Sequence, residues 1–170
     1  MYPIKPKYPG FYRLVFLSVE IWALIGGLVL FLIVLINAYS IIAGATIGKP
    51  FAGDFELTEM GSAIAAFCFL PYCQIIGANV TADIFTLKAG PGFIKLTSKI
   101  AAICVVLFAV ILIWRMFLGL FDYLEYGEFT GILQIPIWWA YIPILVSLFL
   151  LFLSSLVSLI YSSNYHKKVE

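Results

Sequence analysis

The sequence predicts an all-α polytopic membrane protein, and three observations lead to that fold class. Hydrophobic residues make up 64% of the 170-residue chain and charged residues only 11%, against about 25% charged in a typical soluble domain. Four long stretches are nearly free of charge, and roughly 20 apolar residues are enough to cross a bilayer as a helix. Their apolar residues run without alternation, as in 28–36, whereas the strands of a membrane barrel alternate polar and apolar residues. We therefore predict four transmembrane helices in a single domain, 1–170.

The first crossing is predicted at about 20–47, after a proline-rich segment, 1–10, that is expected to be extended. Residues 11–20 suit the headgroup region. Glu20 lies at the edge of the apolar run, and we interpret it as an interfacial residue. The alternative is a proton-coupling carboxylate, because ionisable groups inside a span are usually functional.

The second crossing is predicted at about 58–80, with a start near Thr58 where Glu56 and Glu59 favour the positive end of the helix dipole. Small residues follow in close succession, and such residues let helices approach closely in lipid. This segment is therefore expected to be the central helix of the bundle. The residues to which we assign helix packing are Gly61, Ala65 and Pro71.

The cytoplasmic half of that second helix is predicted to be shielded from lipid by other protein segments. Pro71 removes one backbone hydrogen bond and should kink the helix midway. Beyond it, Gln74, Asn79 and Asp83 make the helix more polar than a lipid-facing surface tolerates. These three side chains are therefore expected to have a structural role or to lie at a subunit interface.

A short interfacial helix is predicted over 81–95, where the pattern is amphipathic, with a break at 90–92, Gly-Pro-Gly. The third crossing follows at about 97–121. Arg115 falls near its outer boundary and is expected to snorkel to the interface; the alternative is an ion pair with Glu59 on a neighbouring helix. The fourth crossing is predicted at about 137–161.

The distribution of basic residues predicts that both termini are cytoplasmic. With four crossings, eight of the ten basic residues fall on the side of the amino terminus, and Lys and Arg are enriched in cytoplasmic loops. The eight residues are Lys5, Lys7, Arg13, Lys88, Lys95, Lys99, Lys167 and Lys168.

The sequence carries no motif that indicates catalysis. Cys68, Cys73 and Cys104 are not spaced as a metal pair or a CxxC motif, and no phosphate-binding loop or nucleophile turn is present. We predict that the chain is not an enzyme, holds no metal, cofactor or substrate, and binds no nucleic acid. Transport by this chain alone is also not expected, because the spans show no inverted repeat.

Two features within 48–86 resemble the small membrane subunit (Q subunit) of tripartite ATP-independent periplasmic (TRAP) transporters. In that family a short outer loop ends in an acidic residue that opens the second helix, and Glu59 matches this residue. A Gly-x-His/Asn-Val-x-Val-Asp-like element then closes the helix on the cytoplasmic side. Thr81 and Ala82 differ from the Arg and Val of many members, so no role of that Arg is carried over. The residues that match the second element are Gly77, Asn79, Val80 and Asp83.

The resemblance implies a scaffold subunit of a sodium-coupled importer in a bacterial inner membrane. In this family the partners are a large TRAP membrane subunit and a periplasmic substrate-binding protein that delivers organic acids. The large subunit holds the substrate and sodium and moves them in an elevator-like manner. In this chain, subunit-interface or structural roles are therefore expected for Glu59, Gln74, Asn79, Asp83 and Arg115.

Two functions of other classes stay open at this point. A small drug/proton exporter would use Glu20 as its coupling group, and a membrane thiol oxidoreductase would use Cys68 and Cys73. Uptake by this chain alone that Glu20→Gln abolishes would support the exporter. Full function after all three cysteines are changed to serine would remove the oxidoreductase.

Overall fold

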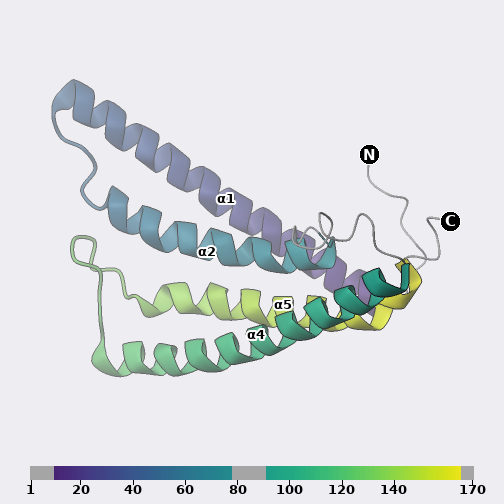
Figure 1. The fold of residues 1–170 in the computed structure, drawn as a ribbon. Helices are drawn as coiled ribbons and strands as arrows, with labels where there is room; N and C mark the ends of the chain where they lie inside the picture. The colour runs from purple at the N-terminus through teal and green to yellow at the C-terminus, as the bar shows by residue number, and fades with distance from the viewer. Residues whose placement is uncertain (1–9, 78–90, 166–170) are drawn as a thin grey trace.

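The structure is a computed structural model that describes residues 10–77 and 91–165. The described residues form the helices α1 (Gly10–Ile47), α2 (Asp54–Ile75), α4 (Pro91–Tyr126) and α5 (Trp138–Tyr165), shown in Figure 1. Outside the helices, the described part holds one isolated β-bridge, between Phe129 and Pro136. The all-α class is therefore confirmed.

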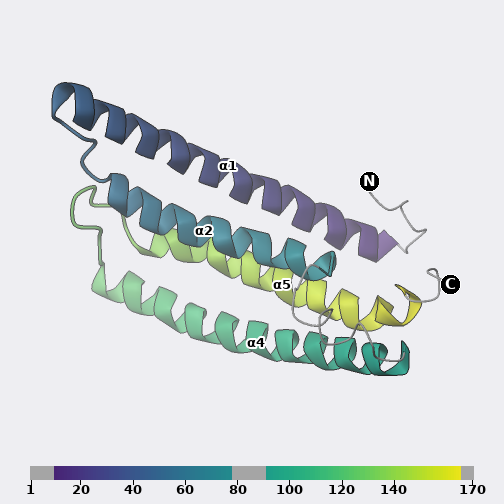
Figure 2. The ribbon, with the colours of Figure 1, turned by 45° about the horizontal axis from the view of Figure 1, so that its top comes forward.

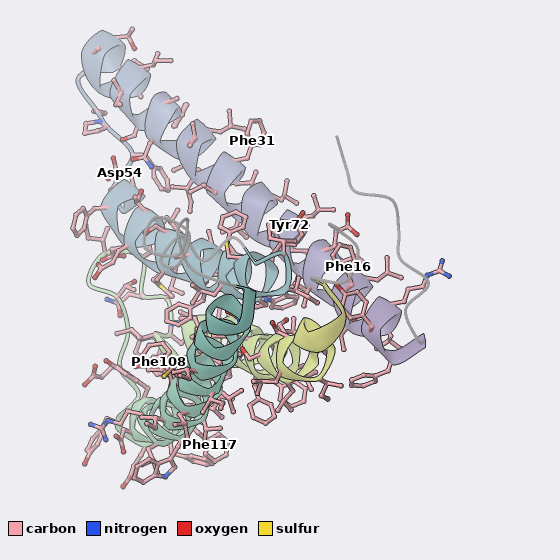
Figure 3. The ribbon with its side chains drawn as sticks, turned by 45° about the vertical axis from the view of Figure 1, so that its right-hand side comes forward. Phe16, Phe31, Asp54, Tyr72, Phe108 and Phe117 are labelled. Carbon is pink, nitrogen blue, oxygen red and sulfur yellow. The ribbon has the colours of Figure 1, made fainter. Side chains whose placement is uncertain are left out.

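Three helices of the described part are long and apolar enough to cross a membrane. They are α1, the Ile100–Tyr126 part of α4, and the Trp138–Ile160 part of α5. Their outward side chains are largely apolar, and Phe31 on α1 and Phe117 on α4 point away from the bundle (Figure 3). The shorter α2 has 22 residues, or about 33 Å at 1.5 Å per residue, but it does not reach the same apolar content. A membrane protein is therefore supported, while the fourth crossing stays a prediction.

The helices lie side by side in the order α1, α2, α5, α4 (Figure 2). Adjacent helices in this row pack against each other, and α5 also contacts α1. The sequence predicted α2 as the central helix. It is an inner helix, and α5, which packs against α1, α2 and α4, is also an inner helix. The connections 48–53 and 127–137 lie at one end of the bundle, which we call the loop end (Figure 1).

Two apolar clusters hold the row of helices together. In one, Ala109 of α4 packs against Ile144, Leu148 and Leu151 of α5, with Phe67 of α2 beside them. In the other, Val15 and Val19 of α1 pack against Val157 of α5, far from the loop end. Since α5 contributes to both clusters, it connects the α4 side of the bundle to the α1 side.

The boundaries of α2 differ from those predicted. The helix begins at Asp54 instead of near Thr58, because acidic residues are well placed in a first helical turn. It ends at Ile75 instead of near 80, where Gly77 adopts a left-handed φ of 70° that favours glycine as a terminator. Pro71 therefore lies near the end of α2, and the midway position predicted for it was wrong. The helix continues through Pro71 to Ile75.

The start of α4 also corrects the sequence-based boundaries. The predicted break at 90–92 is where α4 begins, because Pro91 occupies a first helical position, where its missing N–H costs little. Residues 91–95, which we assigned to an interfacial helix, thus belong to α4. The rest of that predicted helix, together with Asn79 and Asp83, lies outside the described residues. The carboxyl ends of α4 and α5 extend beyond the predicted spans, to Tyr126 and Tyr165.

Candidate functional site

The close contact between α1 and α2 is made by glycine and other small residues. A Cβ atom added at Gly26 would lie 2.5 Å from the Cβ of Cys68, and one added at Gly61 would lie 2.5 Å from Cδ1 of Ile33. Gly61, Ala65 and Cys68 are buried and follow the spacing i, i+4, i+7, which places them on one helix face. This face of α2 is therefore filled by α1.

A polar contact joins three helices inside the apolar bundle. The Trp22 indole N–H of α1 donates a hydrogen bond to Ser147 Oγ of α5 at 2.8 Å. The Ser147 hydroxyl lies 2.8 Å from the Pro143 carbonyl oxygen and 3.7 Å from Cys68 Sγ of α2. We did not identify this contact from the sequence. The available signal was a Trp inside an apolar run, whose buried N–H needs an acceptor.

At the loop end, polar side chains fasten the start of α2 to α1. The Ser40 hydroxyl donates to Asp54 Oδ2 at 2.5 Å and accepts from the Phe51 backbone N–H at 3.1 Å. One turn deeper, the Asn37 amide donates to Thr58 Oγ1 at 2.7 Å. These bonds set the position of the 48–53 connection relative to both helices.

Glu56 joins the two connections of the loop end. Its carboxylate accepts hydrogen bonds from the backbone N–H groups of Ile132 at 2.6 Å and Leu133 at 2.9 Å. The Leu133 side chain lies over Gly53, where an added Cβ would be 2.5 Å from its Cγ. The Leu133 N–H bond lowers the pKa of Glu56; desolvation acts in the opposite direction, and bonds from Ile132, Thr130 and Gly131 lower it further. From the sequence we had assigned Glu56 only an interaction with the helix dipole.

The structure does not bring Glu59 and Arg115 together. Both side chains are exposed, and α5 lies between α2 and α4 (Figure 2). Within the described residues they form no ion pair, so the assumption that their helices are neighbours was wrong. Gln74 is buried and interacts with another group of the chain.

One face of α2 is left uncovered by the bundle. Beyond the exposed Phe55 of its first turn, its exposed residues recur at helical spacing and are mostly small or polar, unlike the exposed faces of α1 and α4. We call this surface the free face of α2, and it comprises Glu59, Ser62, Ala63, Ala66 and Leu70. A face of small residues allows another helix to approach closely in lipid.

The described residues contain no group of three or more His, Cys, Asp or Glu side chains that could hold a metal ion. The three cysteines are free, with Cys68 buried, Cys73 partly buried and Cys104 exposed. Cys68 faces α1, and Cys73 is five residues further along α2, about 140° around the helix. The two thiols therefore lie on different faces of α2.

Comparison with known proteins gives one family. Residues 30–163, more than half of the chain, match the family described as Tripartite ATP-independent periplasmic transporters, DctQ component. The match covers all of α2 and α4, nearly all of α5, and the second half of α1 from residue 30 onward. No curated protein and no solved structure matches the chain.

Proposed function

Since this chain belongs to the DctQ component family of tripartite ATP-independent periplasmic transporters, we propose that it is the static scaffold subunit of a sodium-coupled importer. The family consists of transporter components and not of enzymes, and its DctQ component is the small membrane subunit. The family match is the observation that carries the proposal. It agrees with a bundle whose long helices present apolar side chains outward.

The proposed transporter has a large elevator-type membrane subunit that binds the organic acid and the sodium ions. A periplasmic binding protein delivers the acid, and the present chain contacts no substrate. We place it in a bacterial inner membrane with four crossings and both termini in the cytoplasm. The loop end, with its acidic residues, then faces the periplasm, in keeping with the tendency of basic residues to stay inside.

We propose that the free face of α2 contacts the large subunit. Two observations support this assignment. The first is that α2 is less apolar than the other three helices, so its exposed surface suits a protein partner better than lipid. The second is that Ser62, Ala63 and Ala66 are exposed and small, which favours close helix packing where lipid provides no hydrophobic driving force.

Substitution of Ala66 by Leu tests this interface. The larger side chain should overpack the contact, at a cost of ~1 kcal/mol or more, and so reduce copurification of the large subunit by about fivefold. Ala101→Leu on α4, another exposed alanine, serves as the matched control and should leave copurification unchanged. Affinity capture of the tagged chain followed by quantitative mass spectrometry measures both. Equal recovery in the two variants would exclude the free face as the contact.

The transport proposal itself is tested by reconstitution in liposomes. Uptake of an organic acid should require this chain, the large subunit, the binding protein and an inward sodium gradient together. Uptake by this chain alone would contradict the scaffold function, whatever the result for the free face.

A further inference from the structure

The connection between α4 and α5 folds into a compact loop of its own. We call residues 128–137 the outer loop. The Thr130 N–H donates to the Ile135 carbonyl at 2.9 Å, and the Ile137 N–H donates to the Glu128 carbonyl at 3.2 Å. Gln134 sits in the left-handed region with φ 55°, and its amide nitrogen donates to the carbonyls of Thr130 and Gly131 at 3.2 and 3.1 Å.

The N–H groups at the tip of the outer loop donate to α2. Those of Ile132 and Leu133 both go to the Glu56 carboxylate. A carboxylate binds such donors more strongly than a neutral oxygen does, since charge-assisted hydrogen bonds are about twice as strong. An apolar contact, between the Leu133 side chain and the surface at Gly53, lies beside these bonds. The hydrogen bonds to the charged Glu56 carboxylate are therefore the strongest polar contact between the outer loop and α2.

This tie also links α2 to the segment that joins α4 and α5. The α4 helix packs on α5, whereas α1 packs mainly on α2. At the loop end, Glu56 connects α2 to the segment between α4 and α5. None of the residues in the two apolar clusters belongs to the outer loop.

We propose that Glu56 is a charge-dependent latch, whose ionised carboxylate holds the outer loop on α2 and whose loss of charge releases the loop. The latch goes beyond the scaffold function and does not depend on it. It sets the position of the exposed Phe129 and Ile132 side chains at the end of the bundle.

The direction of the Glu56 pKa shift tells at which pH the outer loop is held on α2. The pKa of Glu56, which precedes the proposed span at 58–80, is lowered from its ordinary value of 4.5 by the Leu133 N–H first of all. A lowered pKa means that the docked loop stabilises the ionised form of Glu56, and the ionised form in turn stabilises docking. This stabilisation is fully present above the ordinary pKa of Glu56 and is lost as the pH falls through its lowered pKa.

The neighbouring titratable groups do not account for this shift. On α2, Asp54 is bound by the Ser40 hydroxyl and Glu59 is exposed; Lys49 and Glu128, on the two connections, are also exposed. The causes of the shift are desolvation and hydrogen bonds from 130–133. The hydrogen bonds from the outer loop therefore lower the pKa of the Glu56 carboxyl group.

Hydrogen exchange on the full-length chain in lipid nanodiscs tests the latch. Glu56→Gln should reduce the protection of the Ile132 and Leu133 amides at neutral pH by about tenfold, because it removes the charge and replaces one of the two acceptor oxygens by an NH₂ donor. Glu59→Gln is the matched control, since Glu59 lies one turn along the same helix and is exposed. It should leave the protection of the outer loop unchanged. Equal protection in the wild type and Glu56→Gln would overturn the proposal, as would an equal loss in Glu59→Gln.

A second measurement needs no substitution. When the pH is lowered from 7 to about 2.5, below the ordinary carboxyl range, the wild-type outer loop should lose protection relative to intrinsic exchange rates. The loop of Glu56→Gln should change little. Peptides of α5 that keep their protection show that the bundle stays folded during the measurement. A wild-type outer loop that stays protected at pH 2.5 would also overturn the latch.

Discussion

At the scale of single residues, the contact between α1 and α2 depends on the absence of side-chain atoms. Gly26 lets α1 approach so closely that an added Cβ would be 2.5 Å from Cys68 Cβ and 3.4 Å from the Ala65 carbonyl oxygen. The neighbouring Gly27 has no atom within 4 Å of such a Cβ. There is therefore no room for a side chain at Gly26, whereas Gly27 has room for one.

Substitution of Gly26 or Gly27 by alanine separates two contributions to stability, the steric cost of an added methyl group and the higher helix propensity of alanine. Gly27→Ala should leave stability unchanged or raise it by up to about 1 kcal/mol, since alanine is the better helix former. Gly26→Ala should lower it, because overpacking costs about 1–3 kcal/mol and offsets that gain. Thermal unfolding of both variants in the same detergent measures the difference. Equal unfolding temperatures would contradict the close approach at Gly26.

Individual polar residues also show where sequence-based assignment reached its limit. We selected Glu59 as the acidic residue that opens α2, but it is Glu56 that makes hydrogen bonds to a distant segment. Both residues lie in the same helical stretch and have the same chemistry. Which of them meets the outer loop depends on the position of residues more than 70 positions away, and no local pattern encodes that contact.

At the scale of elements, α5 shows two kinds of buried serine. Ser147 accepts the Trp22 hydrogen bond, whereas the hydroxyl oxygens of Ser154 and Ser155 are buried and have no hydrogen-bond partner among the described residues. All three positions are small and lie where neighbouring helices pack. Only Ser147 therefore combines a packing role with a hydrogen bond to another helix.

Replacement of each serine by alanine distinguishes these roles. Ser147→Ala should destabilise the bundle by about 1 kcal/mol, the usual net value of a hydrogen bond. Ser154→Ala and Ser155→Ala should be neutral or slightly stabilising, because each removes a buried hydroxyl that lacks a partner. Unfolding in detergent at a fixed lipid content provides the comparison. Equal losses in all three variants would mean that the Trp22 bond contributes nothing specific.

At the scale of the whole molecule, the four helices of the described residues form a row, and within those residues three are long and apolar enough to cross a membrane. The inner position of α2 between α1 and α5 explains how a less apolar helix is accommodated, since two of its faces are covered by protein (Figure 2). The third, free face is left for the proposed partner. The prediction of four crossings therefore depends on α2.

Cysteine labelling from the two sides of the membrane tests that crossing. In a chain whose native cysteines are replaced by serine, Lys49→Cys should react with an impermeant thiol reagent in intact spheroplasts. Lys88→Cys should react only after the membrane is opened, because four crossings place the two positions on opposite sides. Labelling of both positions in intact spheroplasts would exclude α2 as a span.

The sequence by itself determined the solvent of this protein, the presence of four long helices and the family it resembles. These follow from apolar runs and backbone hydrogen bonding in lipid, which act within a single segment. Only the tertiary structure decided the order α1, α2, α5, α4, the separation of Glu59 from Arg115, and the contact of Glu56 with the outer loop. Those features depend on which helix faces meet. In lipid that choice is made by shape and a few hydrogen bonds between residues far apart in the chain.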